Sequence, residues 1–186
     1  MIRWIFFVML AYVAVVVQTT VGGLLVIHTA WVGPVAPDVL AMVAVFVAMA
    51  VRNRADAGLA CWVLGLGLDL ASGPGATTVV GPMAFAYGLG GLAVFQLREA
   101  LFRDKIVTQV VMVLFFAAAT HALWITLQAL VTRSLTWNEY GNALLQAVML
   151  GAYSGVLAPF VHAVLLRYER IVLIVPSRRS RSKNDF

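Results

Sequence analysis

The chain has 186 residues, of which 62% are hydrophobic and only 11% are charged, and its mean hydropathy is +0.95. Soluble domains carry about 25% charged residues, so this composition excludes a water-soluble enzyme and a disordered protein. Cys61 is the single cysteine, which excludes a scaffold held by intrachain disulfides. The composition is that of a membrane protein. At roughly 20 residues per crossing, the chain has room for about six helices.

Charges and turn residues divide the apolar sequence into six stretches that predict membrane-spanning helices. In chain order they cover residues 4–23, 38–51, 57–70, 78–97, 106–131 and 143–166. The second and third are short for a complete crossing. We therefore expect an all-α integral membrane protein with one six-helix domain over residues 1–170, followed by a basic cytoplasmic tail over 171–186. A loop rich in Gly, Pro and Trp is expected between the first two helices.

The net charge of +5 favours a lipid bilayer over a nucleic acid as the partner of this chain. Positive residues accumulate on the cytoplasmic side of membrane helices. With the N-terminus in the cytoplasm and six crossings, only Arg133 among the 13 lysines and arginines lies on the outer side. Both termini are therefore expected in the cytoplasm, with the basic tail close to anionic headgroups.

Two acidic residues within the apolar stretches are candidates for a structural role. Asp38 follows Pro37 at the start of the second stretch and is predicted to cap that helix. Asp69, late in the third stretch, has three interpretations: a helix end in contact with water, a hydrogen-bond acceptor for the following loop, or a chemical role. We predict the second, with Ser72, Gly73 or nearby N–H groups as donors, because such bonds are charge-assisted.

Small residues predict that the third and fourth helices pack closely. Ala57, Cys61 and Gly65 precede Asp69 at intervals of four and therefore share its helix face. Gly88 belongs to a series of small residues in the fourth helix. Small faces allow the backbones of two membrane helices to approach one another.

The sequence lacks the spacing patterns of known catalytic and metal sites. His121 and His162 are expected to be hydrogen-bonding residues that face the bundle rather than proton relays, and no second ligand at helical spacing accompanies either one. The stretch before Asp69 does not match the intramembrane aspartyl protease motif G-x-G-D, no phosphate-binding loop is present, and no Ser-x-x-Lys dyad occurs within the apolar stretches. We therefore expect a binding or scaffold protein with no cofactor and no metal, rather than an enzyme.

The order of several short motifs resembles the rod shape-determining protein MreD family. The matching features are Gln18 late in the first helix, Pro37-Asp38-Val39-Leu40, Gly65-x-x-x-Asp69-Leu70-x-Ser72-Gly73, Gly75 with Gly81, and Ala84-Phe85-Ala86-Tyr87. This resemblance implies a non-enzymatic subunit of the cell-elongation complex in the bacterial cytoplasmic membrane, which supports cell shape and lateral peptidoglycan synthesis. It also implies MreC as a direct partner, MreB, RodA and the elongation transpeptidase as further associates, and a fold similar to the S-component of energy-coupling-factor vitamin transporters.

The first helix is the expected docking surface for the transmembrane helix of MreC. Ala11, Ala14 and Gln18 lie on one of its faces, and a small-residue face favours helix association in lipid. The S-component resemblance also points to the first helix. The alternative is that this face is buried within the bundle. The alternative function is a transporter subunit that binds a small molecule such as a vitamin.

Overall fold

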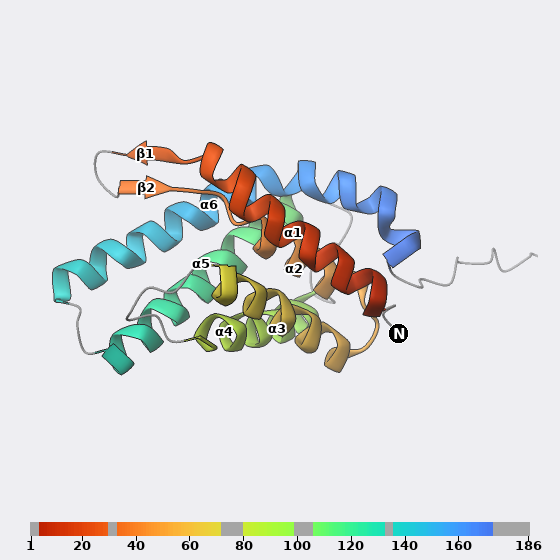
Figure 1. Ribbon diagram of the computed structural model, residues 1–186, viewed down its shortest axis with the longest axis horizontal. Helices are drawn as coiled ribbons and strands as arrows, with labels where there is room; N and C mark the ends of the chain where they lie inside the picture. Colours follow the sequence, from red (N-terminus) through yellow and green to blue (C-terminus); the bar gives the residue numbers. More distant parts are fainter. Residues whose placement is uncertain (1–3, 30–32, 72–79, 99–105, 133–135, 173–186) are drawn as a thin grey trace, which may run out of the picture.

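The computed structural model describes residues 4–29, 33–71, 80–98, 106–132 and 136–172. Within these ranges the chain forms six helices and one two-stranded hairpin (Figure 1). In chain order the elements are α1 (Trp4–Leu24), β1 (Ile27–Thr29), β2 (Gly33–Val35), α2 (Val39–Ala50), α3 (Arg54–Ala71), α4 (Pro82–Leu97), α5 (Ile106–Thr132) and α6 (Trp137–Val172).

Three of these helices, α1, α5 and α6, are long and apolar enough to cross a membrane. The expected positions of all six helices agree with the structure in their centres, but four ends differ by three residues or more. These are the starts of α3, α6 and α4, and the end of α6, which reaches Val172 rather than residue 166. α3 starts three residues early, where the side chain of Asn53 accepts a hydrogen bond from the N–H of Ala55 (3.2 Å). α6 starts at Trp137 rather than at residue 143. Glu139 accepts hydrogen bonds from the N–H and the hydroxyl of Thr136 at 2.8 Å each, the start of a capping box.

The start of α4 is the third difference. Pro82 occupies the first turn of α4, where its missing N–H group costs nothing and its fixed φ suits a helix. Residues 80 and 81 are therefore outside the helix. Residues 78 and 79 are outside the described ranges, as is the part of the expected basic tail that follows α6.

α2 is the core of the molecule. Every residue from Leu40 to Ala50 is buried, and α2 contacts each of the other five helices. A helix that is apolar on all sides is stable only inside a bundle or a membrane. Its 12 residues extend about 18 Å, which is less than the roughly 30 Å of the hydrocarbon core.

Close helix pairs surround this core. A Cβ added at Gly65 of α3 would lie 2.7 Å from the carbonyl oxygen of Met83 in α4, and one at Gly91 would lie 2.4 Å from Sγ of Cys61. Ala57 and Cys61 are fully buried in the same seam. Gly88 is less constrained, because its nearest neighbour, a side-chain carbon of Trp62, would be 3.5 Å away. Gly88 thus also faces α3, and Gly91 makes the closer contact of the two.

α5 and α6 form a second close pair through glycines that our sequence analysis did not single out. A Cβ added at Gly151 would lie 2.7 Å from the carbonyl oxygen of Leu114, and one at Gly155 would lie 2.9 Å from that of Val110. The two glycines form a G-x-x-x-G motif, the known signature of close helix contacts in membranes.

The expected loop between α1 and α2 is instead a β-hairpin, with Thr29 paired to Gly33 and Ile27 paired to Val35. The hairpin lies at the end of the bundle opposite the N-terminus, which shares its end with the last turns of α6 (Figure 1). Gln146 of α6 donates a hydrogen bond from Nε2 to the carbonyl oxygen of Pro34 at 2.7 Å. This bond fixes the path of the chain from the hairpin into the bundle.

Candidate functional site

The chain enters the bundle as an extended segment, residues 33–38, and only then starts α2. Val35, Pro37 and Asp38 are all buried, with exposed fractions of 4% or less. Extended backbone inside a bundle leaves polar groups without helical partners, and each such group needs another partner in an apolar environment. Pro34 and Pro37 have no N–H group, which reduces the number of donors that must be satisfied.

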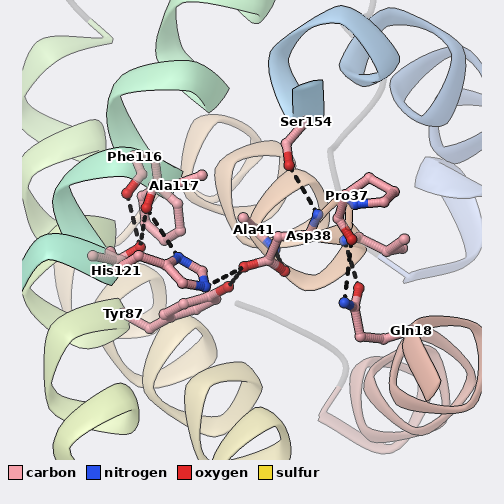
Figure 2. Close-up of polar contacts among 11 residues, drawn as sticks. Gln18, Pro37, Asp38, Ala41, Tyr87, Phe116, Ala117, His121 and Ser154 are labelled. Atoms are coloured by element: carbon pink, nitrogen blue, oxygen red, sulfur yellow. Dashed lines mark hydrogen bonds and ion pairs between the residues drawn. The ribbon is translucent and has the colours of Figure 1, made fainter. Parts of the chain in front are cut away.

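Side chains from α1 and α6 satisfy the backbone at the end of this segment (Figure 2). The Gln18 side chain accepts a hydrogen bond from the N–H of Val39 (2.7 Å) and donates one to the carbonyl oxygen of Pro37 (3.2 Å). The hydroxyl of Ser154 accepts a bond from the N–H of Asp38 (2.8 Å). An amide and a hydroxyl thus occupy the places that water molecules would take in a surface loop.

The carboxylate of Asp38 joins three helices. Its Oδ1 accepts a hydrogen bond from the N–H of Ala41 at 2.9 Å, so Asp38 caps α2, and a negative charge at a helix N-terminus is favourable. Its Oδ2 accepts a bond from the hydroxyl of Tyr87 in α4 and lies 3.7 Å from Nε2 of His121 in α5. In Figure 2, Tyr87 and His121 point toward this oxygen from the same side.

This cluster lies well inside the bundle. His121 precedes the end of α5 by 11 residues, about 17 Å along the helix axis. Asp38 is 2% exposed and the His121 side chain 14%, while Tyr87 is fully buried. Ionisable side chains at such depth in a membrane protein pair with one another or with backbone groups, as they do here.

Side chains also satisfy the opposite end of α2. The guanidinium of Arg98, which follows α4, donates hydrogen bonds to the carbonyl oxygens of Met49 (3.4 Å) and Val51 and lies over the ring of Phe95 at 3.8 Å. A cation at a helix C-terminus is favourable. α2 therefore has a carboxylate at its start and a guanidinium at its end, each complementing the local helix dipole.

Asp69 has a similar role for α4. Its Oδ2 accepts hydrogen bonds from the N–H groups of Gly81 (2.9 Å) and Ala84 (3.1 Å). The expected role as a hydrogen-bond acceptor thus applies to the start of α4. Ser72 and Gly73, the donors first considered, lie outside the described residues.

His162 of α6 is the other buried histidine. Its Nε2 lies 3.0 Å from the carbonyl oxygen of Met42, and since a carbonyl can only accept, Nε2 carries the proton. Nδ1 is buried and has no hydrogen-bond partner in the described part of the chain. His162 therefore packs α6 against α2 as a neutral imidazole with one unused acceptor.

The expected docking residues on α1 face the interior of the chain. Ala11 and Ala14 are 8% and 4% exposed and belong to the hydrophobic core, and Gln18 bonds the start of α2. This face packs against α2 and α3 and is not available to a partner helix. The outer face of α1 carries larger side chains such as Met9 and Tyr12, which are 62% and 71% exposed.

Gln18, Asp38 and His121 are each recognisable in the sequence as isolated polar residues, but the sequence alone does not place them together. Ser154 is missing from the predicted residues, and Tyr87 is among them only as part of a family motif. No local pattern connects these positions, which lie on five different elements. A usable signal was the occurrence of isolated polar residues in the apolar stretches, because such residues seek one another inside a bundle.

The hydrogen bonds of the cluster are those of a helix cap. A nucleophile is activated by a base that takes its proton, whereas the hydroxyl of Ser154 accepts a bond from a backbone N–H and Asp38 serves as a cap. Among the described residues, no group of three His, Cys, Asp or Glu side chains could hold a metal ion.

Comparison of the chain with models of protein families, with curated proteins and with solved structures gave no match.

Proposed function

We propose that this protein is a non-enzymatic membrane subunit of the bacterial cell-elongation complex, similar to MreD, and that it binds the transmembrane helix of MreC. The observation that supports this most is the use of interior polar side chains as helix caps. Asp38, Gln18 and Ser154 hold the start of α2, and Arg98 holds its end. These groups build a rigid scaffold and leave apolar side chains on the outside.

All six helices lie in the bilayer in this proposal, in an arrangement similar to that of an S-component. The short α2 crosses together with the extended segment before it. Six extended residues add about 20 Å to the roughly 18 Å of α2, which exceeds the hydrocarbon thickness. Non-helical backbone is tolerated at membrane depth where protein surrounds it, and Val35, Pro37 and Asp38 of this segment are buried.

The proposed location is the bacterial cytoplasmic membrane with both termini inside. The end of α2 lies beside the end of α4, where Arg98 bonds it, and Arg52 and Arg54 follow on the same side. The hairpin lies at the other end of the bundle (Figure 1). This distribution supports the positive-inside orientation. MreB, RodA and the elongation transpeptidase join through MreC or through the cytoplasmic end.

Photocrosslinking in native membranes tests the partner. Four exposed aromatic side chains lie on four different helices, namely Tyr12 on α1, Phe85 on α4, Phe115 on α5 and Phe160 on α6, with exposed fractions of 53–72%. A photoreactive phenylalanine analogue fits each position with little change of shape. We expect one of them to crosslink to MreC, and an unirradiated sample of each variant serves as the negative control.

Depletion of the protein from a rod-shaped host tests the cellular role. We expect the cells to become round, and we expect MreC to copurify with the chain from native membranes. Normal rod shape after depletion, together with the absence of MreC from every crosslink, would refute the proposal.

The second candidate is an S-component-like subunit that binds a small molecule. The start of α2 deep in the bundle favours it, because broken helices at membrane depth form binding sites in transporters. However, the polar groups there already bond one another. A vitamin that copurifies with the chain, or uptake restored in a transport-deficient strain, would support this second function over the first.

A further inference from the structure

The helices around α2 place several titratable side chains near its axis. Asp38 starts α2. The surrounding helices contribute Tyr87 from α4, His121 from α5, His162 from α6, Cys61 from α3 and, after α4, Arg98. In its described length, α1 contributes the uncharged amide of Gln18 to this region.

Most of these groups are engaged elsewhere along α2. Nε2 of His162 bonds the carbonyl oxygen of Met42, and the thiol of Cys61 bonds that of Ala44 at 3.5 Å. Arg98 bonds the far end of α2, about 18 Å from its start. Among the described residues, His121 is therefore the basic side chain within ion-pair distance of Asp38.

The hydrogen bond at Nδ1 of His121 determines whether Nε2 is a hydrogen-bond donor or an acceptor. Nδ1 lies 3.0 Å from the carbonyl oxygen of Ala117, and a carbonyl oxygen only accepts, so Nδ1 carries a proton. In a neutral imidazole Nε2 would then be a bare acceptor. It would face Oδ2 of Asp38, another acceptor, at 3.7 Å.

Two facing acceptors repel one another, and a lone carboxylate inside a membrane protein is costly. One additional proton removes both problems. The carboxylate side is already favourable for a charge, because Asp38 accepts bonds from the N–H of Ala41 and the hydroxyl of Tyr87 and lies at a helix N-terminus. The position that lacks a proton is therefore Nε2 of His121.

We propose that the Asp38 cluster is a buried proton-binding site in which one proton resides on Nε2 of His121. The resulting imidazolium neutralises Asp38 and holds the middle of α5 against the start of α2. The proton is thus the ligand that links these two helices. This inference concerns the interior of the chain and does not depend on the proposed partner.

Nitrogen NMR of the full-length chain in lipid bilayers tests the proposal directly, with nitrogen-15 in the imidazole rings. The chain has three histidines, and the structure predicts a different state for each. His121 carries protons on both nitrogens at neutral pH. His162 is neutral with its proton on Nε2, and the exposed His28 of β1 lies outside the bundle interior and serves as the reference signal.

Asp38→Asn is the decisive variant, because Asn is also a good helix cap and the fold is retained. We expect His121 to become neutral with its proton on Nδ1, while the His162 signals stay unchanged. A neutral His121 in the wild-type chain at neutral pH would overturn the proposal. So would a His121 that stays charged in Asp38→Asn.

A charge-rescue experiment gives a second readout. His121→Leu removes the proton carrier and leaves Asp38 without a counter-charge, so its unfolding temperature should fall. Adding Asp38→Asn to this variant removes the stranded charge and should raise the unfolding temperature again. A double variant that unfolds at or below the temperature of His121→Leu would contradict the proposal.

Discussion

Adding a single methyl group at Gly65 should destabilise the bundle, although alanine is the better helix former. The new Cβ would lie 2.7 Å from the carbonyl oxygen of Met83, 2.8 Å from Cα of Ala84 and 2.8 Å from Cβ of Tyr87. Two of these atoms belong to the backbone of α4 and cannot rotate away. Ordinary contact begins near 3.4 Å, so α3 and α4 must separate by about 0.7 Å in a close-packed interior.

The magnitude follows from two opposing terms. Overpacking lowers the free energy of unfolding by about 1–3 kcal/mol. The replacement of a helical glycine by alanine raises it by about 0.5–1 kcal/mol. The net loss of unfolding free energy is about 1–2 kcal/mol. Each kcal/mol shifts the unfolding temperature of a chain of this size by about 2–4 °C, so the expected decrease is roughly 2–8 °C. Heating in detergent, followed by size-exclusion chromatography of the surviving monodisperse protein, measures this change.

Two matched controls receive the same methyl group. At Gly88 the nearest atom would be 3.5 Å away, and at Gly23 nothing lies within 4 Å. Both variants should be as stable as the wild type or more stable, by up to about 1 kcal/mol. The reasoning is refuted if Gly65→Ala unfolds at the same temperature as Gly88→Ala.

Three further sets of substitutions, at Asp69, at Arg98 and on α1, test the caps and the face of α1. Asp69→Leu leaves the first N–H groups of α4 without an acceptor and should lower the free energy of unfolding by about 1–3 kcal/mol. Asp69→Asn should lower it less, because Asn also caps helices. Equal unfolding temperatures of the two variants would contradict this. Arg98→Leu removes the donor for the end of α2 and should also cost about 1–3 kcal/mol in the same assay. Ala11→Leu combined with Ala14→Leu should overpack the core and lower the free energy of unfolding by about 1–3 kcal/mol per site. The control Val13→Leu, at an exposed position of the same helix, should change it by less than about 0.5 kcal/mol. A monodisperse, stable double variant would show that this face is free.

The helices of this protein could largely be predicted from the sequence, because charges and turn residues interrupt the apolar stretches. The centre of every described helix lies within its predicted range. The ends were harder, since polar caps extend a helix beyond its apolar run. The side chains of Asn53 and Glu139 supply such caps, and Pro82 delays the start of α4. The hairpin was missed because strands of three residues have no detectable alternation.

The candidate site was predictable only in parts. The sequence indicated Asp38 as a helix cap because a Pro-Asp pair precedes an apolar stretch, and that role depends on neighbouring residues alone. Its contacts with Tyr87, His121 and Ser154 depend on how α4, α5 and α6 pack, and they span 49 to 116 residues of sequence. The face of Ala11 was interpreted in the wrong direction because small residues favour close packing equally inside a bundle and against a partner.

The distant caps of α2 also set an order for biogenesis. The N–H of Asp38 receives its acceptor from Ser154, which is 116 residues later in the chain. At synthesis rates of about 5–20 residues per second, the ribosome completes that distance in roughly 6–23 seconds. During this interval the start of α2 has emerged without its final acceptor, and Arg98 has followed well before Ser154. The central helix of this bundle therefore receives the partner of its C-terminal end first, and its N-terminal end becomes complete only when α6 packs against it.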